Sequence, residues 1–269
     1  MHLVDKDSVR DLMDAAFISP SKDKGQNFLV DVEKCKNIVK LLKNDVNSKV
    51  LEIGPGLGSL TYHLQERCNN LTLIDVDERI IYYLECEVNQ GVGLVLEDAL
   101  KYDISSYEYI ISNIPYSITS DLMEHILIHG TKVKQFVLMM QKENFAHFYD
   151  VSGSEYGPLS VLVHLLGNIK KEFDVGATSF VPQPKCTSTV FTIETNNLYD
   201  REKAIQTYRL SKKLFLNRRK TILNNLGATI GKEKALRILE SLNISPLKRP
   251  EELGPDIFYQ INTIINEND

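Results

Sequence analysis

The chain has 269 residues, of which 43% are hydrophobic and 25% charged, and its formal net charge is -5 at pH 7. This length allows one large domain with a smaller partner, and the composition excludes a disordered or membrane-spanning protein. No apolar run approaches the roughly 18 residues of a spanning helix, and the charged amino terminus lacks the pattern of a secretory signal, so we expect a cytoplasmic protein.

The negative charge is unevenly spread along the chain. Residues 1–194 hold 18 basic and 27 acidic side chains, whereas residues 195–269 hold 13 basic and 9 acidic ones. Within 207–220 there are six basic residues and no acidic one: Arg209, Lys212, Lys213, Arg218, Arg219 and Lys220. Such a run is typical of a surface that binds nucleic-acid phosphates, and equally of a solvated helix face.

Short apolar runs alternate with helical patterns from residue 49 onward. Strands are predicted at 49–54, 70–76, 92–98, 107–114, 135–141 and 188–195, and helices at 58–68 and 78–88. This alternation predicts an α/β fold, a Rossmann-like doubly wound sheet. After residue 195 the patterns are helical, so we expect a first domain at 1–195 and a small all-α domain at 196–269.

Polar or glycine residues follow four of the predicted strands. Ligands of such sheets bind at the carboxyl ends of the strands. We therefore expect these residues to converge on one site: Gly54, Asp75, Asp98 and Asn113.

A glycine-rich turn, "LEIGPGLGSLT" at 51–61, joins the first of these strands to a helix. Gly54 and Gly56 allow tight turning and leave the backbone open to a ligand. The spacing is GxGxG after an acidic Glu52, which favours the cationic S-adenosylmethionine over a pyrophosphate cofactor. Asp75 is suited to accept from ribose hydroxyls, and Asp98 from the adenine amine.

The segment "NIPY" at 113–116 has the groups that methylation of an adenine amine requires. The Asn113 side-chain oxygen and the Ile114 carbonyl can accept hydrogen bonds from the amine, while Pro115 restrains the backbone between them. Tyr116 offers a flat face for stacking the base. Since the sulfonium is an excellent leaving group, alignment suffices and no strong general base is needed.

Several longer stretches carry a resemblance over nearly the whole chain beyond residue 24. They are "GQNFL" at 25–29, "LEIGPGLGSLT", "EDAL" at 97–100, "NIPY", "MMQKE" at 139–143, "YGPLSVLV" at 156–163, "FVPQPK" at 180–185 and "RRKTILNNL" at 218–226. The chain thus resembles the small-subunit ribosomal RNA adenine dimethyltransferases. That resemblance implies transfer of four methyl groups from S-adenosylmethionine to two adjacent adenines near the 3′ end of the RNA, in an immature ribosomal particle. We expect a monomer without a bound metal.

The resemblance also implies roles for individual residues. It assigns cofactor contacts to Asn27, Leu29, Gly54, Asp75, Asp98 and Asn113, to which we add Gln26, Glu52 and Gly56. It implies that Phe180 stacks on the flipped base opposite Tyr116. It favours RNA contact by the basic residues of 207–220.

The chain departs from the family pattern at a few positions. Ser112 stands where Gly is usual and Ser117 where Asn is common, and we expect both to alter the pocket entrance. Asp75 replaces a frequent Glu, and "KCTS" at 185–188 replaces "KVDS". Alternatives are a large-subunit rRNA methyltransferase of the macrolide-resistance type, which "RRKTILNNL" disfavours, a DNA or protein amide methyltransferase, and a non-catalytic assembly or transcription factor.

Overall fold

The computed structural model describes residues 27–267, which fold as two compact units. The first unit contains the described residues up to Lys142 together with Lys170–Thr195, and the second contains Glu143–Ile169 together with Asn196 onward. One division thus falls between residues 195 and 196. The segment 143–169, expected in the first domain, groups with the carboxy-terminal helices, because its apolar helix packs on two of them.

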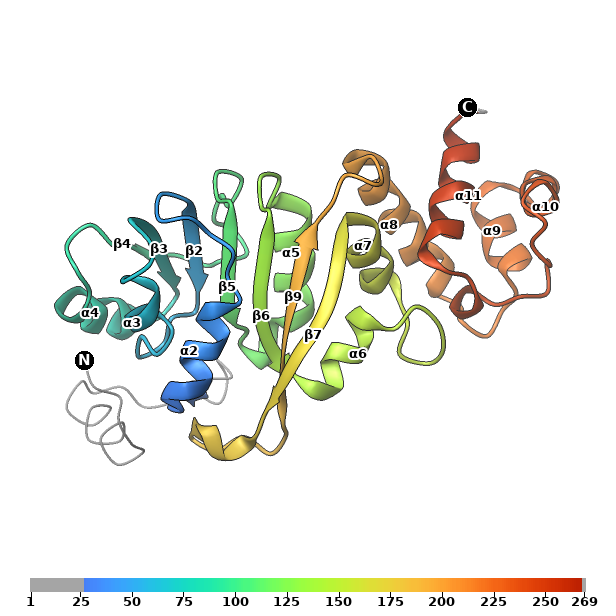
Figure 1. Cartoon of the computed structure of the whole chain (residues 1–269). Coiled ribbons are helices and arrows are strands. Elements are labelled where there is room, and N and C mark those ends of the chain that lie inside the picture. The colour runs from blue at the N-terminus through green and yellow to red at the C-terminus, as the bar shows by residue number, and fades with distance from the viewer. Residues whose placement is uncertain (1–26, 268–269) are drawn as a thin grey trace. The chain divides into compact units, whose positions relative to one another are not determined.

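A seven-stranded sheet with the order β4-β3-β2-β5-β6-β9-β7 organises the fold (Figure 1). The first five of these strands pair in parallel, and β9 runs antiparallel to β6. The strands are β2 (Lys49–Ile53), β3 (Asn70–Asp75), β4 (Gly93–Leu96), β5 (Tyr109–Asn113), β6 (Gln135–Gln141), β7 (Gly167–Val175) and β9 (Ser188–Thr195). The predicted α/β, Rossmann-like class is confirmed.

Three strands were not predicted from the sequence patterns. The strand β7, at the edge of the sheet, is largely polar and carries no continuous apolar run. Short strands β1 (Phe28–Leu29) and β8 (Phe180–Val181) pair with each other in a separate antiparallel sheet. A two-residue strand has no recognisable periodicity, so only its distant partner defines it.

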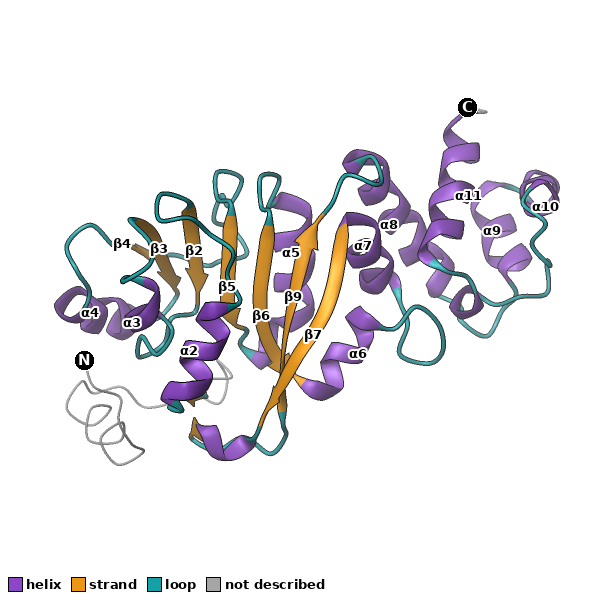
Figure 2. Cartoon of the chain, viewed as in Figure 1, coloured by secondary structure: helices purple, strands orange, loops and turns teal. Residues whose placement is uncertain are grey.

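Helices cover both faces of the sheet in the first unit (Figure 2). They are α2 (Val32–Lys40), α3 (Thr61–Leu64), α4 (Glu78–Glu87) and α5 (Thr119–His129), with short helices η1 (Tyr116–Ile118) and η2 (Ala177–Ser179). Buried residues of α2, α3 and α4 share one hydrophobic cluster with alternate residues of the strands. By contrast, Gly130 at the end of α5 lies close to Phe136 of β6. The Phe136 side chain does not belong to the hydrophobic cluster of α2, α3 and α4.

Local chemistry explains the helix boundaries. Asp31 and Asp77 are the N-cap residues of α2 and α4, each with a side-chain oxygen that accepts from a backbone N–H of the first turn. The predicted helix 58–68 is reduced to Thr61–Leu64, because the residues before it form the glycine-rich turn. Among residues 27–267, no helix is long and apolar enough to cross a membrane.

The second unit is helical around an aromatic core. Its helices are α6 (Lys142–Tyr149, from Glu143 onward), α7 (Pro158–Leu166), α8 (Arg201–Phe215), α9 (Ile222–Ile230), α10 (Lys232–Ser241), η3 (Pro250–Glu252) and α11 (Pro255–Glu267). Tyr156 meets Phe215 edge-on, with ring centroids 5.5 Å apart, and Phe258 lies 5.5 Å from Phe215. These three buried rings join the α7 segment to α8 and α11.

Candidate active site

A cavity of about 330 Å³ lies at the carboxyl ends of β2, β3, β4 and β5. It is lined by four residues at the carboxyl ends of the predicted strands, Gly54, Asp75, Asp98 and Asn113. Further predicted site residues on its wall are Asn27, Leu29, Glu52, Gly56, Ile114, Pro115 and Tyr116. The parallel pairing of β3, β2 and β5 brings these strand ends together, since parallel strands end at the same edge of the sheet.

The glycine-rich turn shapes the floor of this cavity. Gly54 and Gly56 have φ angles of +67° and +55°, a left-handed backbone that L side chains rarely adopt. At Gly56 a Cβ would also come within 2.9 Å of the Phe28 ring, whereas at Gly54 the nearest atom, on Pro115, is 3.8 Å away. Glycine is therefore required at position 56 by both the positive φ angle and the nearby Phe28 ring, and at position 54 by the positive φ angle.

Glu52 is a carboxyl group buried beneath the turn. It is 1% exposed, and its Oε2 accepts a hydrogen bond of 2.7 Å from the Thr61 hydroxyl. Burial raises the pKa of Glu52 to about 8, against the lowering effect of that hydrogen bond. Without a bound cation, burial thus favours the protonated, neutral form of Glu52 near neutral pH.

The two aspartates at neighbouring strand ends are held by their own turns. Asp75 Oδ1 accepts from the Asp77 backbone N–H at 2.9 Å, and Asp98 Oδ1 accepts from the Leu100 N–H at 3.0 Å. These bonds fix each carboxylate at the wall of the cavity. Glu52, Asp75 and Asp98 therefore line one ligand volume, together with Glu97.

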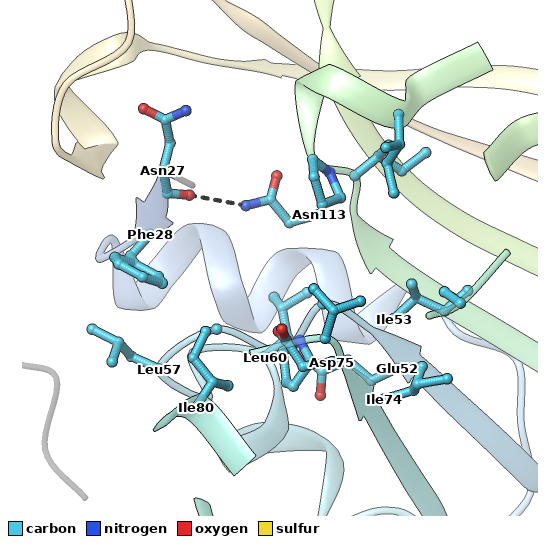
Figure 3. A pocket seen from close by; sticks show the side chains of 18 of the residues that line it. Asn27, Phe28, Glu52, Ile53, Leu57, Leu60, Ile74, Asp75, Ile80 and Asn113 are labelled. Atoms are coloured by element: carbon cyan, nitrogen blue, oxygen red, sulfur yellow. Dashed lines mark hydrogen bonds between the residues drawn. The ribbon is translucent and has the colours of Figure 1, made fainter. Parts of the chain in front are cut away.

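Asn113 is oriented by a residue far away in the chain. Its Nδ2 donates to the Asn27 carbonyl oxygen at 3.3 Å, as Figure 3 shows. Because a carbonyl can only accept, this contact requires the amide nitrogen on the Asn27 side. The Asn113 oxygen consequently points away from Asn27, as an acceptor within the cavity wall.

The residues after Asn113 are anchored to the adjacent strand. The Ile114 N–H donates to the Met139 carbonyl of β6 at 2.9 Å, and Pro115, with φ −59° and ψ 129°, precedes η1. Tyr116 begins η1, and its hydroxyl lies 3.0 Å from the Ser188 hydroxyl of β9. The "NIPY" backbone is thus tied to the neighbouring strand β6, and the Tyr116 ring to β9, which lies beyond β6 in the sheet.

Other predicted residues do not come to the cavity. Phe180 is 1% exposed, pairs with Leu29 across the β1–β8 sheet and is absent from the cavity lining. Its ring belongs to the hydrophobic core in this conformation. Gln26 lies outside the described residues.

The two serines that depart from the family pattern behave differently. Ser117 lines the cavity, as expected of a residue at its entrance. Ser112 is 2% exposed, its hydroxyl donates to the Ile53 carbonyl at 2.8 Å, and it is not part of the lining. The expectation that Ser112 alters the entrance is therefore wrong, because its hydroxyl joins β5 to β2 within the sheet.

Sequence reasoning missed several apolar wall residues. They are Phe28, Leu57, Ile74, Val76, Ile80 and Leu100. The signal available in the sequence is the position of Val76 directly after Asp75 at a strand end, where ligands of such sheets bind. In the structure Val76 is 53% exposed and so has no role in the core. Phe28 lies between the predicted contacts Asn27 and Leu29, but only the fold brings its ring close to Gly56.

The basic residues of 207–220 belong to the second unit. Arg209, Lys212 and Lys213 are exposed on α8, and Arg219 and Lys220 are exposed beyond its end. Arg218 instead donates to the Gly153 and Tyr156 carbonyls at 3.0 and 2.8 Å, and its guanidinium lies 5.7 Å from the Phe215 ring centroid. Five of the six cations therefore face solvent, and Arg218 is bound within its own unit.

The sequence model of the family described as Ribosomal RNA adenine dimethylase matches residues 19–267. The chain belongs to this family. It is 36% identical to the "Ribosomal RNA small subunit methyltransferase A" of Mesoplasma florum, over 91% of this chain and 97% of that protein. The protein of the same name from Streptococcus thermophilus is 30% identical over 99% of both chains.

Solved structures agree with this membership of the dimethylase family. The dimethyladenosine transferase from Plasmodium falciparum superposes with a TM-score of 0.75 at 26% identity, covering 88% of this chain and 96% of that one. The 23S rRNA methyltransferase ErmE has a TM-score of 0.70 at 20% identity, over 89% and 99% of the two chains. At that identity ErmE shares the fold, and the likeness says nothing further about the substrate.

Proposed function

We propose that this dimethylase transfers methyl groups from S-adenosylmethionine to the N6 amines of two adjacent adenines near the 3′ end of small-subunit rRNA, giving N6,N6-dimethyladenosine during ribosome maturation. The observation that carries the proposal is the fixed amide of Asn113, whose nitrogen is bound to Asn27 and whose oxygen is left to accept from a substrate amine. The relatives named small subunit methyltransferase A supply the choice of RNA.

The wall of the cavity fits the cofactor by its chemistry. S-adenosylmethionine, when bound, supplies a methyl group on a cationic sulfur that leaves readily. Asp75 would accept from the ribose hydroxyls and Asp98 from the adenine amine, with apolar Val76 and Leu100 beside the base. Glu52 would face the cationic amino-acid part, and Gly54 and Gly56 would let the backbone approach it.

The residues of 113–116 act on the target base. Asn113 Oδ1 accepts one hydrogen of the adenine amine and the Ile114 carbonyl accepts the other, so the nitrogen lone pair is directed out of the base plane. Pro115 restrains the carbonyl before it, since proline limits the conformation of the preceding residue. Tyr116 stacks on the base, a contact worth about 1–3 kcal/mol. Alignment of this kind lowers the barrier without a strong general base.

The second unit contributes RNA contacts in this proposal. The exposed cations on and after α8 would bind phosphates, and Arg218 is left out of the binding set because its Nη2 already donates to two carbonyls of its own unit. We propose that the enzyme acts as a monomer on an immature small ribosomal particle in the cytoplasm. The residues that bind RNA would then lie mainly within 196–269.

The test is methyl transfer with labelled S-adenosylmethionine. Small ribosomal subunits that lack the mark should accept label, and mass spectrometry of their digested RNA should reveal dimethyladenosine at two neighbouring positions. Label that enters only large-subunit RNA would support the macrolide-resistance alternative. Cofactor binding without any transfer to either subunit would support a non-catalytic assembly factor.

A further inference from the structure

The hydroxyl of Tyr116 makes a single described contact that reaches past a neighbouring strand. Tyr116 follows β5, Ser188 begins β9, and their hydroxyl oxygens are 3.0 Å apart. In the sheet, β6 lies between β5 and β9. The Tyr116 side chain therefore extends across the end of β6 to reach its partner.

Ser188 is a rigid partner. It is fully buried, at 0% exposed, and pairs with Gln141 at the end of the antiparallel β6–β9 ladder. The residue before it, Thr187, accepts from the Lys142 N–H at 3.0 Å. A buried hydroxyl on a strand that is paired with its neighbour is a fixed point from which another side chain can be oriented.

Tyr116 itself needs such a fixed point. It starts a short 3-10 helix whose side chains are not deeply buried, and it is one of the residues that line the cavity. Stacking on a base demands a defined ring plane, and an unrestrained ring loses rotamer freedom at each binding event. A hydrogen bond at the far end of the ring fixes the torsion angles before the base arrives.

We propose that Ser188 is a positioning residue for the target adenine, which acts by holding the Tyr116 hydroxyl and thereby the plane of the ring. This inference rests on the proposed function, because it assigns the stacking surface of the same site. Ser188 touches neither cofactor nor base in this arrangement. Its contribution should therefore appear in the capture of the base and leave the affinity for S-adenosylmethionine unchanged.

The experiment uses the full chain in four forms: wild type, Ser188→Ala, Tyr116→Phe and the double variant. Tyr116→Phe retains the ring and removes the bond from the other side, so the two single variants delete one interaction by independent routes. The matched control is Thr189→Val, which removes a neighbouring buried hydroxyl that donates to Asp174 at 2.8 Å and lies outside the cavity lining.

The readouts are chosen to separate positioning from folding. Base capture is followed by the fluorescence of a small-subunit hairpin RNA with 2-aminopurine at one target adenine, which changes when the probe leaves the helix and stacks on a ring. Affinity for S-adenosylmethionine is measured by calorimetry, and stability by thermal unfolding. Methyl transfer to unmarked small subunits gives kcat and KM.

We expect Ser188→Ala and Tyr116→Phe each to weaken capture of the probe about three- to tenfold, the range for loss of one hydrogen bond. The double variant should be no worse than either single one. Affinity for S-adenosylmethionine should stay within about twofold in all forms, and Thr189→Val should capture the probe as wild type does.

Three results would overturn the inference. They are additive effects in the double variant, unchanged capture in Ser188→Ala, and an equal loss in Thr189→Val that follows the loss of thermal stability. If the wild-type protein itself leaves the probe fluorescence unchanged and transfers no methyl group to small subunits, the proposed function fails instead. The two failures are thus distinguished by the wild-type measurement.

Discussion

The side-chain nitrogen of Asn113 and the backbone oxygen of Asn27 lie 3.3 Å apart although 86 positions separate them in the chain. This contact fixes which end of the Asn113 amide faces the substrate. An asparagine free to rotate would present a donor as often as an acceptor, and a donor would repel an amine hydrogen. The segment that contains Asn27 is thus part of the catalytic apparatus that we propose.

Replacing Asn113 by alanine should abolish methyl transfer, because the acceptor for the amine is lost. We expect affinity for S-adenosylmethionine to stay within about tenfold of wild type, or about 1.4 kcal/mol. Single-turnover transfer and calorimetry measure the two effects. Asn69→Ala is a suitable control, since its amide bonds to Asn47 beside the opposite end of β3. Residual transfer above a few per cent in Asn113→Ala would contradict the role.

Cofactor affinity should depend on pH through Glu52. Burial raises the pKa of this carboxyl to about 8, and a bound cation favours the charged form, so binding should release a proton. Affinity for S-adenosylmethionine should therefore increase as pH rises toward 8, by at most about tenfold per pH unit for one proton. Calorimetry in buffers of different ionisation enthalpy would count the proton. Glu52→Gln should remove the dependence.

The same carboxyl predicts a change in the free energy of unfolding. Its pKa in the folded chain, about 8, is above the ordinary 4.5, so the folded state holds a proton that the unfolded state has lost. Without ligand, this contribution to stability is full below pH 4.5 and is lost as pH rises to about 8. Denaturant unfolding of wild type and Glu52→Gln should diverge over that interval, and parallel curves would show that Glu52 is ionised throughout.

Alanine should be tolerated less well at Gly56 than at Gly54. Both have positive φ, which costs a side chain about 1–2 kcal/mol, but only at Gly56 would the new Cβ meet an aromatic ring, that of Phe28, at 2.9 Å. Chemical unfolding and cofactor affinity should both rank Gly56→Ala as the more severe. Adding Phe28→Leu should restore part of the loss in Gly56→Ala and none in Gly54→Ala. Equal effects at the two glycines would exclude the steric explanation.

Arg218→Ala should destabilise the protein. The guanidinium donates to the Gly153 and Tyr156 carbonyls, and hydrogen bonds to a charged group are worth about 1.5–3 kcal/mol. The midpoint of thermal unfolding should fall by several degrees. Its neighbour Arg219 is exposed, so Arg219→Ala is the matched control and should unfold as wild type. An unchanged midpoint in Arg218→Ala would show that these two hydrogen bonds add nothing to stability.

A pair of charge reversals tests the RNA surface. Lys212→Glu with Arg219→Glu changes two exposed cations, one on α8 and one after it. If they contact phosphates, affinity for the small subunit should fall, and its dependence on salt should become shallower by roughly one unit of slope per lost contact. Filter binding between low and moderate salt measures both. Unchanged affinity would mean that these residues form a solvated helix face.

The sequence by itself determined the residues that meet at the sheet edge. Gly54, Asp75, Asp98 and Asn113 follow strands whose apolar runs and intervening helices are local patterns, and parallel pairing then places their carboxyl ends side by side. The glycine turn was equally readable, since a left-handed backbone requires glycine at Gly54 and Gly56. The family membership rests on the same stretches and is confirmed.

The tertiary structure alone decided how those residues are oriented and charged. The direction of the Asn113 amide depends on its hydrogen bond to Asn27. The raised pKa of Glu52 depends on its complete burial. Arg218 stabilises its own unit because it donates to two carbonyls more than 60 positions away in the chain. Phe180 resembled a stacking residue in the sequence, yet its pairing with Leu29 places it in the core. Hydrogen-bond partners and burial come from segments distant in the chain, and no local pattern of residues encodes them.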